Sequence, residues 1–288
     1  MSVTYQVIGA SSTPPATGKA EREVGRSVRS PVLKARLRQE TVARLRQLIE
    51  ALEARNLSLP GDEDAERIYD RFIASYARRP MRDNAGGTMH NSSFWVFATA
   101  ALLRPPLIVE SGTYLGQSSW MMAEASPDSR IVTFDIVRER LRAKDPRVAY
   151  RLGDWSDDPE FRELPDGALI YFDDHISHPR RIEETVARGG ALALLDDDMP
   201  GHALYATGAP PVPTRAMMQD ADLPPGTRCE WERNGKVYAY DYTKSDAAAG
   251  RRHIAWSTPM PDLTPVNLYV PQSPMTLSGL RTETESEG

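Results

Sequence analysis

Two short acidic runs are the part of the sequence whose residue types most directly suggest chemistry. Asp173 to His175 and Asp196 to Asp198 each follow a short apolar run. If those apolar runs are neighbouring parallel strands, the five carboxylates meet at one sheet edge and repel one another strongly. A hard divalent cation such as Mg²⁺ relieves this repulsion and leaves coordination positions for substrate oxygens. We therefore expect a metal site here, and helix caps or solvated loops are the alternative.

His175 is the residue that we expect to move a proton, and Asp174 beside it is the second candidate for a catalytic role. Hydroxyl groups bound to a metal become more acidic, and a neighbouring imidazole can act as the general base. A lone histidine is more often structural than catalytic, so a structural role for His175 stays open.

A glycine loop, Glu110-Ser-Gly-Thr-Tyr-Leu-Gly116, lies upstream, where an apolar run passes into a helical pattern. Glycines there let the backbone approach a ligand and turn tightly into the next helix. The loop lacks the central glycine of the dinucleotide motif, and the chain has no GxxxxGK phosphate loop, which argues against NAD and ATP. The candidate ligand contacts of this loop are Glu110, Gly112, Thr113, Tyr114 and Gly116.

Two later strand ends support a ligand site at this loop. Asp135 lies about 20 residues after the glycines, where a carboxylate can accept hydrogen bonds from both hydroxyls of a ribose. Gly153-Asp154-Trp155 follows the next apolar run and offers a carboxylate for an adenine amino group and a ring that can stack. A buried or rim aromatic residue is the alternative for Trp155.

Alternating strands and helices would position all of these residues. Strands are predicted at Leu107–Glu110, Arg130–Asp135, Val148–Leu152, Ala168–Phe172 and Ala191–Leu195, and helices at Asn91–Leu103, Gln117–Ala125 and Pro179–Arg188. Such alternation gives parallel strands joined by right-handed crossovers, with helices on both faces. We expect an α/β, Rossmann-like domain over residues 91–245.

An Asn-Gly turn near the end of the chain predicts a β-hairpin between Arg228–Glu232 and Lys236–Tyr242. We expect this antiparallel hairpin to complete the mostly parallel sheet. Residues 246–288 contain repeated prolines and an acidic end, which predict an extended C-terminal tail.

The N-terminal third of the chain predicts helices before the sheet. Residues 1–30 are rich in Ser, Thr, Pro, Gly and charge and predict a flexible arm. Amphipathic patterns at Pro31–Asn56 and Asp62–Ala77 predict a helical subdomain over residues 31–90, which could cover an active site or make a homodimer or higher homo-oligomer. The segment Asn84–Asn91, with Gly87, is a candidate lid; its alternative is a helix-capping loop with Asn91 or Ser92 as the cap.

Composition limits the classes of protein. The 288 residues carry a formal charge of −5, so a nucleic acid is not expected as the main partner. The single cysteine, Cys229, excludes an internal disulfide and a zinc site built from several cysteines. The sequence has no apolar run long enough for a signal peptide or a membrane span, so we expect a cytoplasmic protein without a membrane partner.

The glycine loop, Asp135, the Gly-Asp-Trp segment and the predicted hairpin resemble class I S-adenosylmethionine-dependent methyltransferases over about residues 91–242. The resemblance implies that Glu110, Gly112 and Gly116 line the methionine and ribose part of S-adenosylmethionine (SAM). It also implies that Asp135 holds the ribose and that Asp154 lies near adenine. Tyr114 departs from the pattern, because many members have a glycine there.

The acidic runs look like those of the metal-dependent branch that includes the cephalosporin hydroxylase-like proteins and macrolide-sugar O-methyltransferases. This resemblance implies Asp173, Asp196 and Asp197 as metal ligands, with Asp174 as the alternative first ligand, and Mg²⁺ as the metal. It also implies O-methylation of a hydroxyl on a sugar or small natural product. The proline-rich stretch Pro200–Pro225 is expected to shape the acceptor pocket.

Two other functions fit the same residues. The first is a metal-dependent hydroxylase or hydrolase that uses the acidic residues without a methyl donor. The second is a non-catalytic protein that keeps the fold to stabilise a partner. Turnover that requires metal but ignores SAM indicates the former, and unchanged function after removal of the acidic side chains indicates the latter.

Overall fold

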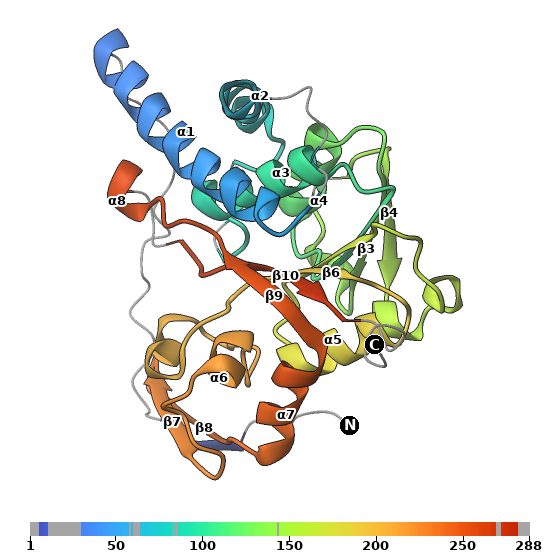
Figure 1. Cartoon of the computed structure of the whole chain (residues 1–288), viewed down its shortest axis with the longest axis vertical. Helices are drawn as coiled ribbons and strands as arrows, with labels where there is room; N and C mark the ends of the chain where they lie inside the picture. The colour runs from blue at the N-terminus through green and yellow to red at the C-terminus, as the bar shows by residue number, and fades with distance from the viewer. Residues whose placement is uncertain are drawn as a thin grey trace.

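The computed structural model describes residues 6–10, 30–57, 59, 64–82, 84, 86–142, 144–268 and 272–281. A seven-stranded sheet forms its centre (Figure 1). The strands are β2 (Leu107–Ser111), β3 (Arg130–Asp135), β4 (Val148–Leu152), β5 (Leu169–Phe172), β6 (Leu192–Leu195), β9 (Ile254–Pro259) and β10 (Thr276–Leu280). Their order is β4-β3-β2-β5-β6-β10-β9. The pairs from β4 to β6 are parallel and β10 is antiparallel to both neighbours, which confirms the predicted mostly parallel α/β fold.

The inner strands are apolar on both faces because both faces of the sheet are covered. In β5, Leu169 and Tyr171 pack into one hydrophobic core, whereas Ile170 and Phe172 pack into the other. A strand buried on both sides needs a continuous apolar run rather than an alternating one. This explains why β2, β5 and β6 could be predicted from short runs of apolar residues.

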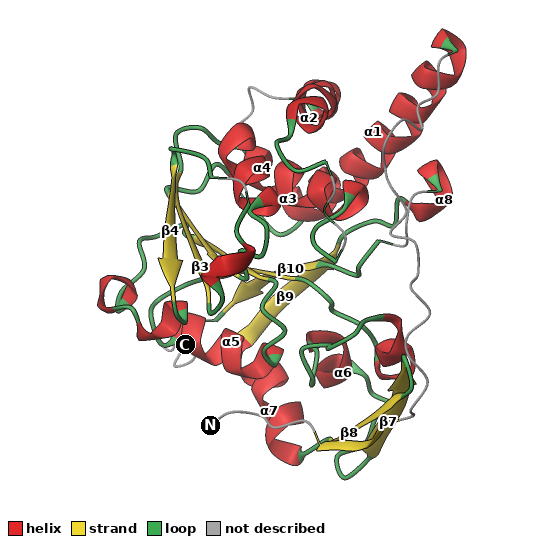
Figure 2. Cartoon of the chain, turned by 180° about the vertical axis from the view of Figure 1, so that it is seen from behind, coloured by secondary structure: helices red, strands yellow, loops and turns green. Residues whose placement is uncertain are grey.

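Helices form a layer on each side of the sheet (Figures 1 and 2). One layer contains α1 (Pro31–Glu53), α2 (Ala65–Arg78), α3 (His90–Leu103) and α4 (Gln117–Ala125), and the other contains α5 (His178–Val186) and α7 (Lys244–His253). For α1 to α5, the predicted boundaries differ from the observed ones by a few residues at most. In α3, 12 of 14 residues are buried because this helix packs against α2 and α4 as well as the sheet. Neither Asn91 nor Ser92 caps it, since the helix begins at His90 and the Asn91 side chain pairs with Asn267.

The Asn-Gly hairpin forms, but the prediction that it completes the main sheet is wrong. Its strands, β7 (Arg228–Arg233) and β8 (Lys236–Asp241), join β1 (Gln6–Ala10) in a separate three-stranded sheet at the bottom of Figure 1. Residues of β7 alternate between exposed and more buried positions, as expected for a sheet covered on one face, whereas the four inner residues of β8 are all partly or fully buried. A short helix, α6 (Arg215–Gln219), precedes this small sheet.

The predicted extended tail is also wrong, because β10 supplies the antiparallel strand of the main sheet. All residues of Thr276–Leu280 are buried, and Leu277 lies in the core beneath α1 to α4. A further short helix, α8 (Thr264–Asn267), separates β9 from β10. Within the predicted flexible arm, Gln6–Ala10 pair with β8, and the rest of the arm lies outside the described residues, as does the acidic end of the chain.

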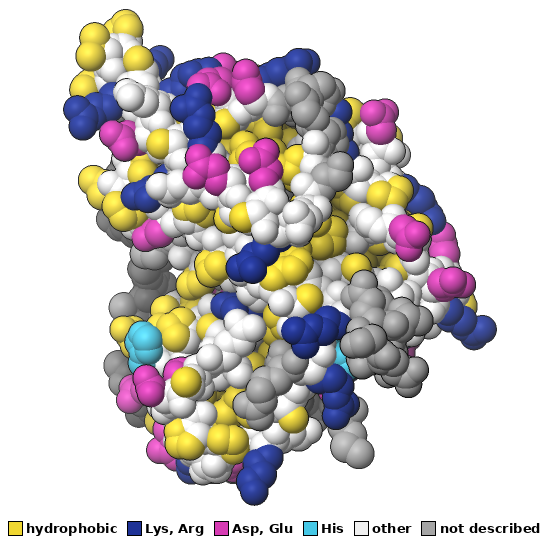
Figure 3. Space-filling view, in the orientation of Figure 1, with side chains coloured by type: hydrophobic (Ala, Val, Ile, Leu, Met, Phe, Trp, Pro, Cys, Tyr) yellow, Lys and Arg dark blue, Asp and Glu magenta, His cyan; other side chains and the backbone are white. Residues whose placement is uncertain are grey.

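The first turns of α1 extend beyond the body of the protein (Figure 1). Apolar side chains are visible at this tip (Figure 3), where Val32 and Leu33 are 75% and 56% exposed. The expected homo-oligomer stays a prediction. Among the described helices, none has the length and apolar character needed to cross a bilayer.

Candidate functional site

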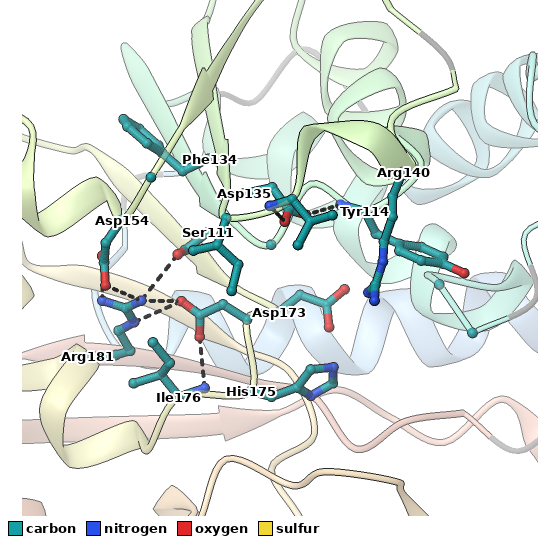
Figure 4. A pocket seen from close by; sticks show the side chains of 17 residues that line it. Ser111, Tyr114, Phe134, Asp135, Arg140, Asp154, Asp173, His175, Ile176 and Arg181 are labelled. Carbon is teal, nitrogen blue, oxygen red and sulfur yellow. Dashed lines mark hydrogen bonds and ion pairs between the residues drawn. The ribbon is translucent and has the colours of Figure 1, made fainter. Parts of the chain in front are cut away.

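The topology of the sheet fixes where a ligand can bind. Strand order reverses between β2 and β5, since β3 and β4 follow on one side and β6 on the other. Ligands of open α/β sheets bind at such a switch point, outside the carboxyl ends of the strands. A cavity of about 490 Å³ opens there (Figure 4). The strand ends contribute Gly112, Asp135, Asp154 and Asp173 to its lining.

Gly112 is required where the loop after β2 meets the loop after β5. Its φ is +108°, and a Cβ atom at this position would lie 2.3 Å from the carbonyl oxygen of Asp173. Only glycine tolerates both the backbone angle and the contact. The glycine therefore serves the junction between two strand ends as well as the approach of a ligand to the backbone.

Asp135 is held by backbone donors and faces the cavity. Its Oδ2 accepts a hydrogen bond of 2.8 Å from the Tyr114 amide, and its Oδ1 accepts one of 2.8 Å from the Val137 amide. No Lys or Arg side chain of the described residues forms an ion pair with it. Each carboxylate oxygen keeps a second lone pair for a ligand hydroxyl. Ile136 beside it is 79% exposed and also lines the cavity.

The two ends of the glycine loop, Glu110 and Gly116, do not line this cavity. Glu110 is fully buried below the loop and accepts hydrogen bonds from the Ser119 and Thr133 hydroxyls, and burial raises its pKa to about 7. Gly116 is the N-cap of α4, with φ +93°. The expected direct contact of these two residues with a ligand is therefore not supported by their positions.

The middle of the loop is divided between two cavities. Tyr114 and Gly87 line the main cavity, together with Gly86 from the predicted lid segment. Thr113 lines only a smaller recess beside it, and its hydroxyl bonds that of Thr133. Tyr114, which replaces the glycine expected in the resemblance, adopts a φ of +46° and donates its amide to Asp135.

Arg181 is a central residue of the site that the sequence did not reveal. It is 1% exposed, comes from α5, and lies between the loops after β4 and β5 (Figure 4). Its guanidinium lies 2.6 Å from Asp174 Oδ2 and 2.9 Å from Asp154 Oδ1, and it also pairs with Glu184. A buried guanidinium needs such partners. Asp154 and Asp174 therefore face an internal counter-ion.

This pairing changes the expected roles of both carboxylates. Burial alone raises the pKa of Asp154, but the Arg181 guanidinium outweighs it and holds that pKa below its usual range. Asp174 Oδ1 accepts a further bond of 3.0 Å from the Ile176 amide. Asp174 is thereby an ion-pair partner of Arg181, so its position does not favour the predicted roles as a catalytic group or an alternative metal ligand.

Trp155 lies in the core, and the expectation that it stacks on a ligand is wrong. It is fully buried, with its ring centroid 5.9 Å from that of Phe172 and 5.1 Å from the Arg188 guanidinium carbon. The short 3₁₀ turn that begins at this residue directs the ring under the sheet, while Asp154 before it faces the cavity.

Three carboxylates meet at the other end of the cavity, and we call Asp173, Asp196 and Asp197 the acidic cluster. They line a small cavity next to the main one, and Asp173 belongs to both. Burial and then the charge of Asp197 raise the pKa of Asp196 to about 7, although the Tyr171 hydroxyl donates to it at 3.0 Å. Burial, followed by Asp196 and Asp197, raises the pKa of Asp173 well above its usual range.

Asp198, the next residue, has a different environment. Burial raises its pKa, but its hydrogen bond with His178 and the charge of Arg215 outweigh this and lower it. The Arg215 Nε–H donates to it at 2.5 Å and the Thr276 hydroxyl at 2.6 Å. Asp198 thus forms a buried structural ion pair with Arg215, whereas no Lys or Arg among the described residues pairs with the acidic cluster.

His175 lies between the two cavities and lines both. Its φ of +58° places it in the left-handed region, and its Nδ1 is 3.3 Å from Asp197 Oδ2. The hydrogen bond with Asp197 is the largest cause of a raised His175 pKa. The side chain is 46% exposed, so its ring is accessible from the cavity.

The donor chemistry of the acidic cluster fits a hard divalent cation. All donors are carboxylate oxygens, and among the described residues only His175, which pairs with Asp197, offsets their charge. As the side chains stand, the described residues contain no group of three His, Cys, Asp or Glu at metal-binding spacing. The ligand roles of Asp173, Asp196 and Asp197 stay predictions.

In comparisons of sequence, no family model and no curated protein matches this chain. Several solved structures that are similar to it are methyltransferases. The methyltransferase PaMTH1 of Podospora anserina, with bound S-adenosylhomocysteine (SAH), is 15% identical with a TM-score of 0.41 over 90% of this chain and 100% of that chain. The O-methyltransferase TomG of Streptomyces achromogenes, from tomaymycin synthesis and in complex with SAM, is 17% identical with a TM-score of 0.39 over 80% of this chain and 94% of that chain. A Mg-SAM form of CmcI is 20% identical with a TM-score of 0.34 over 46% of this chain and 68% of that chain.

Proposed function

We propose that this protein is a SAM-dependent O-methyltransferase that uses Mg²⁺ and methylates a hydroxyl of a sugar or small natural product. The observation that carries the proposal is the cavity at the switch point of the sheet. One side of it presents Gly112 and the backbone-held carboxylate of Asp135, and the other side reaches the acidic cluster. Its volume of about 490 Å³ lies within the range of small-molecule and cofactor sites.

The strand ends suggest how the cofactor lies. Asp135 accepts hydrogen bonds from the ribose hydroxyls, because its oxygens are oriented by two amides and keep free lone pairs. The exposed Ile136 side chain offers an apolar surface for the adenine ring. Asp154 lies on the same side and is fixed by Arg181. This arrangement directs the methionine end and its methyl group toward Asp173.

The acceptor hydroxyl then lies between the methyl group and the acidic cluster. A bound Mg²⁺ supplies positive charge that makes such a hydroxyl more acidic. His175 is at this border and takes the proton, with its ring oriented by Asp197. Pro211, from the proline-rich stretch that we expect to shape the acceptor pocket, lines the same small cavity.

Methyl transfer from labelled SAM tests this function. The protein is incubated with a panel of hydroxyl-bearing sugars and natural products, with Mg²⁺ or with EDTA. We expect label in an acceptor only with Mg²⁺, and loss of that label in Asp196→Asn and Asp197→Asn. Metal-dependent turnover that does not need SAM supports the hydroxylase or hydrolase instead. Biological function that survives both substitutions supports a non-catalytic protein.

A further inference from the structure

Tyr171 is a buried tyrosine that the proposed reaction does not use. It lies on β5, pairs with Leu194 of β6, and is fully buried in the core beneath α1 to α4. Alternate residues of a strand share one face of the sheet, so Asp196, two residues after Leu194, continues the face on which Tyr171 lies. The sheet therefore places a phenol close to the strand end that carries the acidic cluster.

The hydroxyl of Tyr171 orients the side chain of Asp196. It donates to Asp196 Oδ2 at 3.0 Å, and the Asp197 amide donates to Asp196 Oδ1 at 2.8 Å. The Ser273 hydroxyl also neighbours Asp196, and it donates to Asp197 Oδ1. A carboxylate has about four acceptor sites, so Asp196 is held by the protein and still has sites for a further ligand.

The backbone of Asp196 is held as well, by His178 at the start of α5. The Arg215 amide donates to His178 Nδ1 at 2.8 Å, so this nitrogen is an acceptor and the ring hydrogen lies on Nε2. Nε2 is 3.1 Å from the Asp196 carbonyl oxygen and donates to it. Because the backbone is fixed in this way, the contact with Tyr171 sets the direction of the carboxylate.

The contact with Tyr171 orients a carboxylate without neutralising it. Arg215 does both for the next acid but one, Asp198, whereas a hydroxyl supplies one hydrogen and no charge. Asp196 therefore lines the small cavity as an oriented side chain whose ionised form no Lys or Arg of the described residues neutralises. Hydrogen bonds orient carboxylates that bind metals, and their loss typically lowers metal affinity about 10- to 100-fold.

We propose that Tyr171 is a positioning residue for the metal, because its hydroxyl holds Asp196 in the orientation in which the carboxylate binds a divalent cation. The inference rests on the proposed function, since it concerns the Mg²⁺ of that reaction. Tyr171 lines neither the main nor the small cavity, so it acts through Asp196 rather than on a ligand.

Binding of Mn²⁺, followed by electron paramagnetic resonance, tests the inference without any turnover. Mn²⁺ takes the same oxygen ligands as Mg²⁺. We expect Tyr171→Phe, which keeps the ring and removes only the hydroxyl, to weaken Mn²⁺ binding at least tenfold. Tyr150→Phe is the matched control, since the Tyr150 hydroxyl accepts from the Asp145 amide at 2.9 Å, outside the acidic cluster. Its loss should change the Mn²⁺ affinity less than twofold.

Calorimetric binding of SAH to the same variant separates positioning from a general loss of structure. Tyr171→Phe should bind SAH within twofold of the wild type, because Tyr171 does not line the main cavity. Unchanged Mn²⁺ affinity of Tyr171→Phe, or equal weakening of Mn²⁺ and SAH, overturns the inference while Mn²⁺ binding by the wild type upholds the metal of the proposed function. Absence of Mn²⁺ binding by the wild type contradicts that metal, and the inference with it.

Discussion

Two groups of carboxylates lie at the carboxyl ends of the parallel strands, and they differ in what neutralises them. Asp154 and Asp174 share the buried guanidinium of Arg181. Asp173, Asp196 and Asp197 have no Lys or Arg partner among the described residues. Burial and neighbouring carboxylates raise the pKa of Asp173 and Asp196, whereas for Asp197 burial is outweighed by hydrogen bonds, first of all with His175, and its pKa is lowered. The first group is neutralised by a buried internal cation, whereas the second has only the partly exposed His175 beside it, which favours a further counter-ion from outside the protein.

The same difference separates residues that are adjacent in the sequence. Asp173 and Asp174 both line the cavity, but only Asp174 pairs with Arg181. Asp197 lies in the acidic cluster, but Asp198 pairs with Arg215 in the core. Neighbouring residues at a strand end point in opposite directions, so an acidic run divides between two environments.

We expect the largest effect from substitutions in the acidic cluster. Asp196→Asn or Asp197→Asn should lower Mg²⁺-dependent methyl transfer at least a thousandfold, because a metal at the reacting oxygen contributes several kcal/mol to the transition state. Thermal stability without metal should not fall in Asp196→Asn, since burial and the charge of Asp197 already disfavour an ionised Asp196. Asp157→Asn, an exposed acid nearby, serves as the control. Full activity of either cluster variant would remove the cluster from the mechanism.

For Asp154 and Asp174, we expect loss of their cation to lower the stability of the fold. Arg181→Met leaves Asp174 without its cation and Asp154 with only its longer ion pair to Arg180, and is expected to cost about 3–5 kcal/mol of unfolding free energy. Urea unfolding measures this. Arg180→Met is the comparison: Arg180 is the neighbouring residue, is partly exposed, and pairs with Glu184 at 2.7 Å and with Asp154 at 3.3 Å. Its loss should cost about 0–1 kcal/mol. Equal costs for the two variants would contradict the contrast.

The contact between the loop after β2 and the loop after β5 depends on Gly112. Gly112→Ala is expected to cost about 3 kcal/mol, because a left-handed backbone angle and a clash with the Asp173 carbonyl add together. Gly153→Ala separates the two causes, since its φ is +121° but nothing lies within 4 Å of the added Cβ atom. It should cost about 1–2 kcal/mol in the same unfolding measurement. If Gly112→Ala costs no more unfolding free energy than Gly153→Ala, the loops after β2 and β5 can move apart without a measurable penalty.

Glu110 is a third kind of buried carboxylate, neutralised by a proton rather than by a cation. Its pKa in the folded protein is about 7, above the ordinary 4.5, so its contribution to stability is present below pH 4.5 and is lost as the pH rises through 7. Unfolding free energy should fall by about 2–3 kcal/mol from pH 5 to pH 8 relative to Glu110→Gln. Identical pH profiles of the two proteins would show that the carboxyl is not protonated in this way.

The parts of the fold that could be predicted from the sequence depend on local patterns. Strands β2 to β6 are short apolar runs between turns, and the strand ends then place Asp135, Asp154 and Asp173 at one edge by topology alone. Strand β10 could not be predicted in this way. Its residues Thr276–Leu280 include polar side chains and follow a proline-rich segment, and their place between β6 and β9 is set by distant pairing.

The sequence also did not predict which residues pair with one another or how deeply each side chain is buried. The pairing of Arg181 with Asp174 depends on the turn that brings α5 back over the sheet. Trp155 and Glu110 looked like ligand contacts because of their motifs, but one faces the core and the other lies below the loop.

Calorimetric titration of SAM and SAH tests the central claim most directly. We expect one site per chain for each ligand, with a dissociation constant well below 1 mM and at least tenfold weaker binding by Asp135→Ala, because that variant loses the acceptor of the ribose hydroxyls. Absence of heat from both ligands at millimolar concentration, in a wild-type protein that is folded, would contradict the account.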